Sequence, residues 1–307
     1  MRPRDDTFEA HRAELERLAY RMLGSLADAD DVLQDAYLRW SGAHRSSVRS
    51  PRDYLAAVVT RLCIDRRQAI EERKKTYIGQ WLPEPLVDPG RDEPARRLET
   101  AESVSMALMV VLESLSPFER AAYLLRRIFD FGYDEVADVL GKTEVACRQL
   151  VSRAEARIQE RRPRFQSRGE DAERLTTTFL EACTTGDMNG LLAVLATDAA
   201  LYADGGGKAL AALAPIHGAD RVARFFLGIA RKAPENVEIR AVRVNGQPGF
   251  LARHEGQVVQ VLAFDIVDGR IGTIFAIRNP EKLERVAWTT SSLSDPSSRR
   301  SPSPTPP

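Results

Sequence analysis

Two kinds of chemically active side chains stand out in this sequence. Tyr202, Asp204 and His217 are an acid/base set that could deprotonate a carbon atom next to a carbonyl group. Lys and Arg residues, which can neutralise phosphates, gather elsewhere: residues 44–75 hold nine of them against four Asp or Glu, and residues 141–164 hold seven against three. A lone Asp or His is usually structural, and a charged helix face is usually only solvated. Either pattern therefore needs support from the elements around it.

Composition limits the classes of protein that this chain can be. The 307 residues include 44 Lys or Arg and 44 Asp or Glu, so a nucleic-acid surface must arise from local segregation of charge. Residues 170–284, with twelve basic and fifteen acidic residues, form a slightly acidic part. The longest apolar run, residues 106–112, is far shorter than the roughly 20 residues that cross a bilayer, and the N-terminus does not resemble a signal peptide. Three widely separated cysteines exclude a disulfide framework and a zinc ribbon. We expect a cytoplasmic protein of two or three domains, with no membrane partner, no metal and no other cofactor.

Apolar residues recur at helical spacing in residues 8–75 and again in residues 94–164. One stripe covers residues 15–23, a second helix follows the acidic turn at residues 28–31, and a third begins at Pro51. Residues 116–119 (SPFE) are a capping box that begins a helix. Gly141 ends one helix, and Thr143 caps a long one that runs to about residue 161. Helix, short turn and helix is a helix-turn-helix pattern.

The remaining segments divide the helical regions and follow them. Four prolines within residues 81–94 forbid a continuous helix, which indicates a linker. Helices near residues 172–184 and 220–232 accompany strand-like segments at 237–244, 249–254, 258–267 and 271–277, separated by turns such as Asn245-Gly246. Helices followed by an antiparallel meander predict an α+β domain. The Ser- and Pro-rich end is typical of disorder.

Five motifs in order resemble a known family. Residues 28–40 (DADDVLQDAYLRW) resemble the core-polymerase-binding helix of bacterial sigma factors, and residues 146–153 (ACRQLVSR) resemble the recognition helix of their promoter-reading domain. WLPEP at 81–85, DGGGK at 204–208 and NPEKL at 279–283 are similar to motifs of the extracytoplasmic-function (ECF) subgroup that carries a fused SnoaL-like domain. The resemblance covers residues 8 to about 284.

The resemblance implies a multi-domain fold: two all-α helical sigma domains, the second with a helix-turn-helix, and a C-terminal α+β SnoaL-like cone. The expected division is a core-polymerase and −10 domain at 8–75, a linker at 76–102, a −35 domain at 103–165, a regulatory domain at 170–284 and a disordered tail at 285–307. The implied partners are the β′ and β subunits of core RNA polymerase and promoter DNA.

The same resemblance assigns roles to residues of the first domain. Those expected to bind the polymerase form a polar edge of one helix: Asp28, Asp31, Gln34, Asp35 and Arg39. Those expected to hold the −10 element are cations, which suit a single-stranded backbone: Arg45, Arg49, Arg52, Arg61, Arg66 and Arg67.

In the second domain, Val145, Leu150, Val151, Ala154 and Ile158 are predicted to form the buried stripe of the recognition helix. The residues then expected to face the −35 element are Lys142, Thr143, Glu144, Cys147, Arg148, Ser152, Arg153 and Arg157. Among these we expect Arg148 to make a bidentate contact to guanine and Glu144 or Cys147 to discriminate bases.

Three roles remain open for the extra domain. As a regulator, it would bind the linker through the three additional motifs, in place of a separate anti-sigma protein; their residues are Trp81, Leu82, Pro83, Glu84, Pro85, Asp204, Gly205, Gly206, Gly207, Lys208, Asn279, Pro280, Glu281, Lys282 and Leu283. Three glycines beside Asp204 suit close backbone approach better than a substrate pocket, and they favour this role. The alternatives are an enzyme of the ketosteroid-isomerase or cyclase type and a sensor with a small-molecule ligand in its pocket. The prediction for the whole chain is a sigma factor without catalytic residues.

Overall fold

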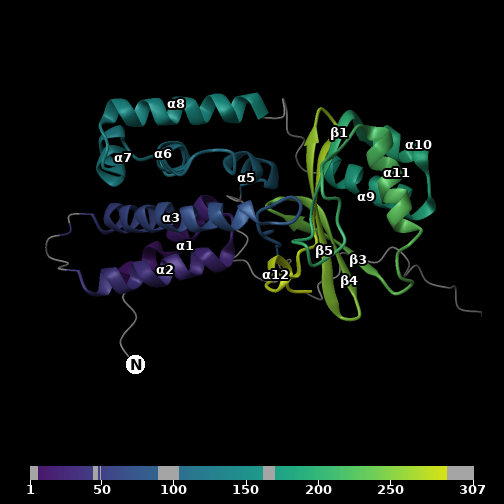
Figure 1. Cartoon of the computed structure of the whole chain (residues 1–307), viewed down its shortest axis with the longest axis horizontal. Coiled ribbons are helices and arrows are strands. Elements are labelled where there is room, and N and C mark those ends of the chain that lie inside the picture. Colours follow the sequence, from purple (N-terminus) through teal and green to yellow (C-terminus); the bar gives the residue numbers. More distant parts are fainter. Residues whose placement is uncertain (1–5, 44–47, 49, 89–103, 162–169, 289–307) are drawn as a thin grey trace, which may run out of the picture.

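The computed structural model describes residues 6–43, 48, 50–88, 104–161 and 170–288 (Figure 1). The first helical domain consists of α1 (Asp6–Leu23), α2 (Leu26–Ser41) and α3 (Pro51–Lys75). The second consists of α5 (Met106–Leu112), α6 (Pro117–Arg127), α7 (Tyr133–Leu140) and α8 (Glu144–Arg161). Three helices in the first domain and the long helix that ends near residue 161 agree with the periodicity of the sequence.

Local capping explains where several of these helices begin and end. Ser116 and Glu119 form the predicted capping box of α6, with Pro117 at its first position. Gly141 adopts a left-handed φ of 63° and ends α7, and the Thr143 hydroxyl accepts a hydrogen bond from Ala146 N at the start of α8. The third helix begins at Pro51 as predicted and ends at Lys75, with Arg73, Lys74 and Lys75 in its last turn, where cations are favoured.

The two helical domains share one hydrophobic core. Residues of α1, α2 and α3 and residues of α6, α7 and α8 belong to a single buried cluster, and α3 contacts both α6 and α7. In Figure 1 the helices of the first domain lie below those of the second, with α3 next to the layer formed by α5, α6 and α7. The two domains therefore form one packed body rather than two separate ones.

The C-terminal domain is built around a six-stranded sheet. Its helices are α9 (Glu170–Thr185), α10 (Met188–Val194), α11 (Ala219–Ala230) and α12 (Pro280–Leu283). Its strands are β1 (Leu195–Asp204), β2 (Ile216–His217), β3 (Glu238–Val244), β4 (Gln247–His254), β5 (Gln257–Val267) and β6 (Arg270–Ile277). The order is β2-β1-β6-β5-β4-β3, with β1 and β6 parallel and the other neighbours antiparallel. The hairpins from β3 to β6 follow the predicted turns, whereas β1, β2 and α10 were not predicted.

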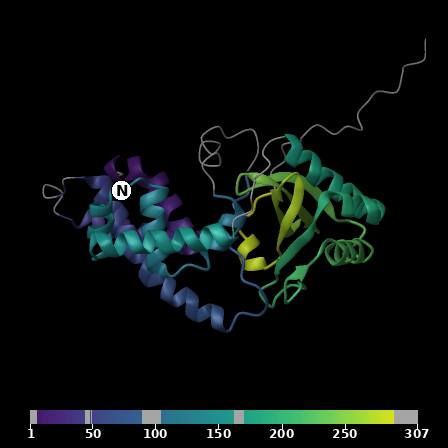
Figure 2. The same ribbon diagram turned by 90° about the horizontal axis from the view of Figure 1, so that it is seen from above.

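The two faces of the sheet pack against different parts of the chain. One face and helices α9, α10 and α11 enclose a cluster that includes Phe179, Phe226 and Phe264. On the other face, Leu82 of the linker and Met106 of α5 pack among residues of β3–β6. Figure 2 shows the sheet between the helical body and its own helices, with α12 at the boundary. The C-terminal domain thus uses one sheet face for its own core and the other to hold the rest of the protein.

Residues 285–288 were expected in the disordered tail, and the structure differs. Val286 and Trp288 pack against the second sheet face, and Arg240 and Arg253 lie 4.7 and 4.4 Å from the Trp288 ring centroid.

No helix in the described part of the chain combines the length and apolar composition needed to cross a membrane.

Candidate functional site

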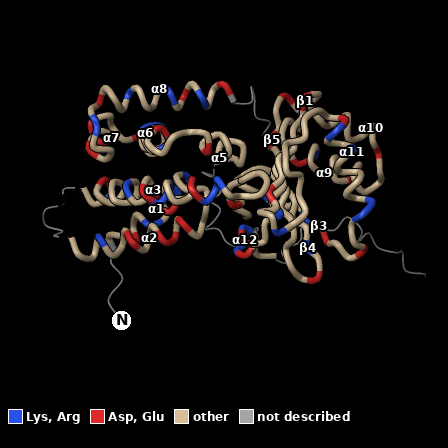
Figure 3. Tube along the Cα trace, viewed as in Figure 1, with Lys and Arg blue, Asp and Glu red and all other residues tan. Residues whose placement is uncertain are grey.

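The outer edge of α2 carries most of the residues expected to bind core polymerase. Asp31, Gln34, Asp35 and Arg39 are exposed, and Figure 3 shows acidic residues along this helix. Asp28 differs from the prediction, because it is buried between Arg66 and Arg73, which donate hydrogen bonds to it at 2.8 and 3.0 Å.

Burial alone would raise the pKa of Asp28, but Arg66 and Arg73 outweigh it and leave the pKa below its ordinary value. Asp28 is therefore an ionised structural anchor for α3 instead of part of an open polar edge.

The cations of α3 that were expected to hold DNA already have protein partners. Arg52 donates to Glu14 at 2.9 Å and to Phe129 O at 3.1 Å, and Arg66 bridges Asp28 and Asp31. Arg61 donates to the carbonyl oxygens of Val139 and Asp138, at the C-terminal end of α7. Arg45 and Arg49 lie outside the described residues. The partners of the described cations lie on α1, α2 and the second helical domain, and Arg52, Arg61 and Arg66 each keep part of their surface exposed.

Arg67 differs from the exposed cation that was expected, because it is buried in this arrangement. Its side chain is 0% exposed, and it donates to Glu113 at 3.0 Å and to Glu71 at 2.7 Å. In this arrangement Arg67 occupies the face of α3 that packs on the second domain, where a buried guanidinium requires a carboxylate partner.

The outer face of α8 presents a row of polar and basic side chains. Figure 3 shows Lys and Arg along the helix. The exposed residues that match the prediction are Lys142, Thr143, Glu144, Arg148, Ser152, Arg153 and Arg157. Glu144 pairs with Arg148 at 3.2 Å, and the Arg148 guanidinium lies 4.2 Å from the Tyr133 ring centroid. Both contacts restrict the Arg148 side chain and orient it before any ligand binds.

Cys147 lies on the buried face of α8 and Val145 on its exposed face, the reverse of the prediction. Cys147 is 0% exposed and Val145 is 66% exposed, so Cys147 is not a base-contacting residue. On a helix of 3.6 residues per turn, Cys147 lies on the same face as Val151, Ala154 and Ile158, whereas Val145 lies opposite Ala154. Burial also raises the pKa of the Cys147 thiol, which favours its neutral form.

Asp204, at the end of β1, is the centre of the contact between the linker and the C-terminal domain. Its Oδ2 accepts hydrogen bonds from Leu82 N at 2.9 Å and from Lys282 Nζ at 2.7 Å. Its Oδ1 accepts one from the Tyr77 hydroxyl at 2.5 Å, and Lys282 also donates to Leu82 O. Asp204 and Lys282 are both buried, and the Lys282 ammonium lies 3.7 Å from the Trp81 ring centroid. We call these five residues the Asp204 cluster: Tyr77, Trp81, Leu82, Asp204 and Lys282.

The glycines after Asp204 permit this close approach. Gly206 and Gly207 have positive φ values of 61° and 71°. A Cβ atom on Gly206 would lie 2.5 Å from the Asn279 amide, and one on Gly207 would lie 2.9 Å from Ile78 of the linker.

The NPEKL residues complete the same contact. Asn279 donates a hydrogen bond to the Tyr77 hydroxyl at 2.8 Å. Asn279 also caps α12, which has Pro280 at its first position. Lys208 forms an ion pair with Glu281 at 2.5 Å. Leu283 packs on the same sheet face as Leu82. The structure therefore brings the three motifs together.

The other half of the WLPEP motif contacts the first helical domain. Glu84 accepts hydrogen bonds from Ser25 Oγ at 2.9 Å and from Leu26 N at 2.7 Å, and Glu84 N donates to Gly24 O. Pro83 and Pro85 are buried beside it. The linker thus binds the C-terminal domain on one side and the turn between α1 and α2 on the other.

Asn245 joins three parts of the chain, and sequence reasoning missed this role. Its backbone N donates to Leu86 O at 2.7 Å, and its side-chain amide donates to the Tyr20 hydroxyl at 2.9 Å and to Val104 O at 3.2 Å. Its Oδ1 accepts from Leu86 N at 3.1 Å. The Asn-Gly pair was interpreted only as a hairpin turn, and no local signal marks the interdomain contact.

Glu113, just after α5, was also missed, and it holds the two helical domains together. It accepts hydrogen bonds from Arg67 and Lys74 of α3 and from Arg120 of α6. Arg67 and Arg120 are fully buried. We call Glu113 with Arg67, Lys74 and Arg120 the Glu113 cluster.

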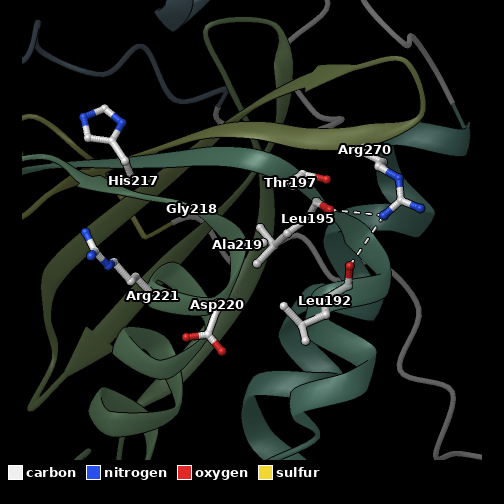
Figure 4. A pocket seen from close by; sticks show the side chains of 9 residues that line it. All are labelled: Leu192, Leu195, Thr197, His217, Gly218, Ala219, Asp220, Arg221 and Arg270. Carbon is white, nitrogen blue, oxygen red and sulfur yellow. Dashed lines mark hydrogen bonds between the residues drawn. The ribbon is translucent and has the colours of Figure 1, made fainter.

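The acid/base set predicted for an enzyme is not assembled as an active site. Asp204 is committed to the linker, and Tyr202 stacks on Phe275 with ring centroids 5.9 Å apart. His217 pairs with Ala200 of β1, its ring centroid lies 6.4 Å from that of Tyr202, and it lines an open pocket of about 470 Å³ beside the first half of β1 (Figure 4). There Arg270 donates to the carbonyl oxygens of Leu192 and Leu195, so it ties α10 to β1. Within the described residues no group of three or more His, Cys, Asp or Glu could hold a metal ion.

Comparison with known proteins identifies the class. Residues 7–72 match the model of sigma-70 region 2, and residues 105–158 match the model of sigma-70 region 4. The chain is 34% identical over 287 residues to the ECF RNA polymerase sigma factor SigJ of Mycobacterium tuberculosis, with 90% of this chain and 91% of that protein covered. It therefore belongs to the ECF sigma factor family. Sigma factors bind core RNA polymerase and promoter DNA, so this protein is a transcription initiation factor and not an enzyme.

Two further matches cover nearly the whole chain. The probable ECF sigma factor SigI of M. tuberculosis is 32% identical over 284 residues, with 92% of this chain and 95% of that protein covered. The crystal structure of M. tuberculosis SigJ superposes with a TM-score of 0.73 at 32% identity and covers 90% of this chain and 97% of that one. The predicted family and the predicted fold class are confirmed. Below, α1–α3 are the region-2 domain, α5–α8 the region-4 domain and residues 170–288 the SnoaL-like domain.

Proposed function

We propose that this sigma factor is regulated in cis. Its SnoaL-like domain binds the linker and thereby holds the region-2 and region-4 domains packed against each other, which we call the closed arrangement. The buried Asp204–Lys282 pair supports this proposal most directly, because it binds both the backbone N–H and the carbonyl oxygen of Leu82. A fused domain acts at high effective concentration, so no separate anti-sigma protein is needed. The protein works on cytoplasmic core polymerase, with the exposed edge of α2 on the β′ subunit.

The closed arrangement is incompatible with reading both promoter elements at once. Elements about 25 base pairs apart lie roughly 80 Å apart along B-form DNA at about 3.4 Å per base pair. The region-2 and region-4 domains share a continuous core, and Arg61 of α3 is bound to the end of α7. Promoter binding therefore requires the two domains to separate, and contacts that favour the closed arrangement oppose it.

Replacing Asp204 tests the regulatory role. Asp204→Asn keeps the shape of the side chain but leaves the buried Lys282 ammonium without its carboxylate, so the linker should be released. We expect transcription from a cognate promoter by reconstituted polymerase to rise at least about fivefold, the lower end of typical coupling between sites. Trp81→Ala should act in the same direction. Asp198→Asn, an exposed acid on the same strand, is the matched control and should change nothing. Wild-type transcription by both Asp204→Asn and Trp81→Ala would contradict cis regulation but not the sigma factor assignment.

Promoter reading by α8 leads to a prediction for Arg148. Because Glu144 and Tyr133 hold this guanidinium on the exposed face, Arg148→Ala should weaken binding to the preferred −35 sequence by about 1–3 kcal/mol and relax base preference at one position. Arg153→Ala, which removes a cation further along the helix, should weaken binding about equally for every −35 sequence. Binding to a promoter library measures both. Unchanged base preference in Arg148→Ala would exclude it as a base contact.

A further inference from the structure

The Asp204 cluster and the Glu113 cluster meet at the Trp81 ring. Lys282 of α12 lies 3.7 Å from the ring centroid, and Lys74 of α3 lies 5.4 Å from it. Lys282 donates to Asp204, whereas Lys74 donates to Glu113. A line of contacts therefore leads from the SnoaL-like domain, through the linker, to the contact between the region-2 and region-4 domains.

Lys282 and Lys74 carry like charges beside the same ring, so each needs a counter-charge of its own. Two ammonium groups beside one ring repel each other, and the position of the Trp81 ring depends on its contacts with both of them. Each is tolerated because it has its own carboxylate, Asp204 for Lys282 and Glu113 for Lys74. Loss of one carboxylate would leave its lysine unbalanced next to the other lysine.

The Glu113 carboxylate influences both lysines. Burial lowers the pKa of Lys282, and Asp204 and, more weakly, Glu113 counteract the shift. Burial likewise lowers the pKa of Lys74, against the opposing effect of Glu113. The charge of Glu113 in the region-4 domain thus reaches Lys282 in the SnoaL-like domain.

We propose that Lys74 is a positioning residue that couples the grip on the linker to closure of the region-2 domain on the region-4 domain. The inference rests on the proposed cis regulation and names the residue through which the SnoaL-like domain affects the contact between the region-2 and region-4 domains. When Lys282 loses Asp204, its unbalanced charge displaces Lys74, and Glu113 then loses one of its three cations. Loosening the Asp204 cluster therefore weakens the Glu113 cluster directly, in addition to freeing the linker.

The test is a double-mutant cycle in the full chain. Dyes on Asp65→Cys of α3 and Ser152→Cys of α8, both exposed positions, report the separation of the two domains by energy transfer; Cys63, Cys147 and Cys183 are buried. Asp204→Asn should raise the ratio of open to closed molecules about tenfold with Lys74 present, and by a clearly smaller factor of about threefold in the Lys74→Met background, where only the release of the linker remains.

Matched variants keep the result independent of folding defects. Lys75→Met makes the same change one residue along, at an exposed lysine that pairs with Glu72, and should preserve the full tenfold effect. Lys74→Arg keeps the positive charge and should show the same tenfold effect of Asp204→Asn as the chain with Lys74. Thermal unfolding of each variant confirms that the labelled chain is folded.

The possible failures are distinguishable. If Asp204→Asn opens the molecule by the same factor with Lys74 and with Met at position 74, the linker acts as a simple tether and the coupling through Lys74 is wrong, while cis regulation stands. If Asp204→Asn changes neither the open fraction nor transcription, cis regulation fails and the coupling fails with it.

Discussion

Replacing Glu113 with Gln is expected to lower the free energy of unfolding by about 3–5 kcal/mol, because Arg67 and Arg120 would be left buried without a carboxylate. Chemical denaturation at pH 7 measures this loss. Glu71→Gln is the matched control: Glu71 pairs with the same Arg67, but its side chain is 47% exposed, so its loss should cost less than about 1 kcal/mol. Equal effects of the two substitutions would contradict a special role for Glu113.

The pH dependence of stability offers a second readout of the same residue. Burial alone would raise the pKa of Glu113, but Arg120, Arg67 and Lys74 outweigh burial and hold the pKa well below its ordinary value of about 4.3. The contribution of Glu113 is therefore fully present above that ordinary value and is lost as the pH falls below it. We expect the wild-type chain to lose more stability than Glu113→Gln between pH 6 and pH 3.

Replacing Asn245 with Gly is expected to have the second large effect. Gly accepts the left-handed φ of 51° that Asn245 adopts, so the turn is retained and only the side chain is lost. Leu86 N, the Tyr20 hydroxyl and Val104 O then lose a buried partner, at about 1–3 kcal/mol for each group left unsatisfied.

The control for Asn245 is another turn of the same sheet. Asp268→Gly removes an exposed side chain at φ 50° in the β5–β6 hairpin and should change the stability by less than about 0.5 kcal/mol. Asn245→Gly should also increase the separation of the domains in the energy-transfer measurement described above, whereas Asp268→Gly should not. A folded Asn245→Gly chain that stays as stable and as closed as the wild type would show that the hairpin is not an interdomain joint.

Several features were predictable because they depend on neighbours a few residues away. The capping box at Ser116, the left-handed Gly141 and the hairpins of β3–β6 all follow from local rules. The short β2 and the strand β1 were missed, since β1 pairs in parallel with β6, some 70 residues later, and carries no turn signal of its own.

The candidate sites likewise combine contacts that the sequence predicted with contacts that only the structure shows. The motifs predicted that the linker would contact residues around Asp204 and Lys282, and these residues do lie together. Periodicity indicates that one face of α8 is buried but not which residues lie at the limits of that face, so Cys147 was placed on the wrong side. Arg67 is buried because the second domain packs on its face of α3, which no local pattern shows.

The sequence by itself determined most of the helices, the hairpins from β3 to β6, the order of domains and the family, because all of these depend on short-range patterns and ordered motifs. Only the tertiary structure decided which charges are buried and what they hold. Glu113 meets Arg67 across 46 positions of sequence, and Asn245 meets Tyr20 across 225. A buried charge or amide is stable only beside a partner that satisfies it, and that partner is supplied by packing rather than by the neighbouring residues.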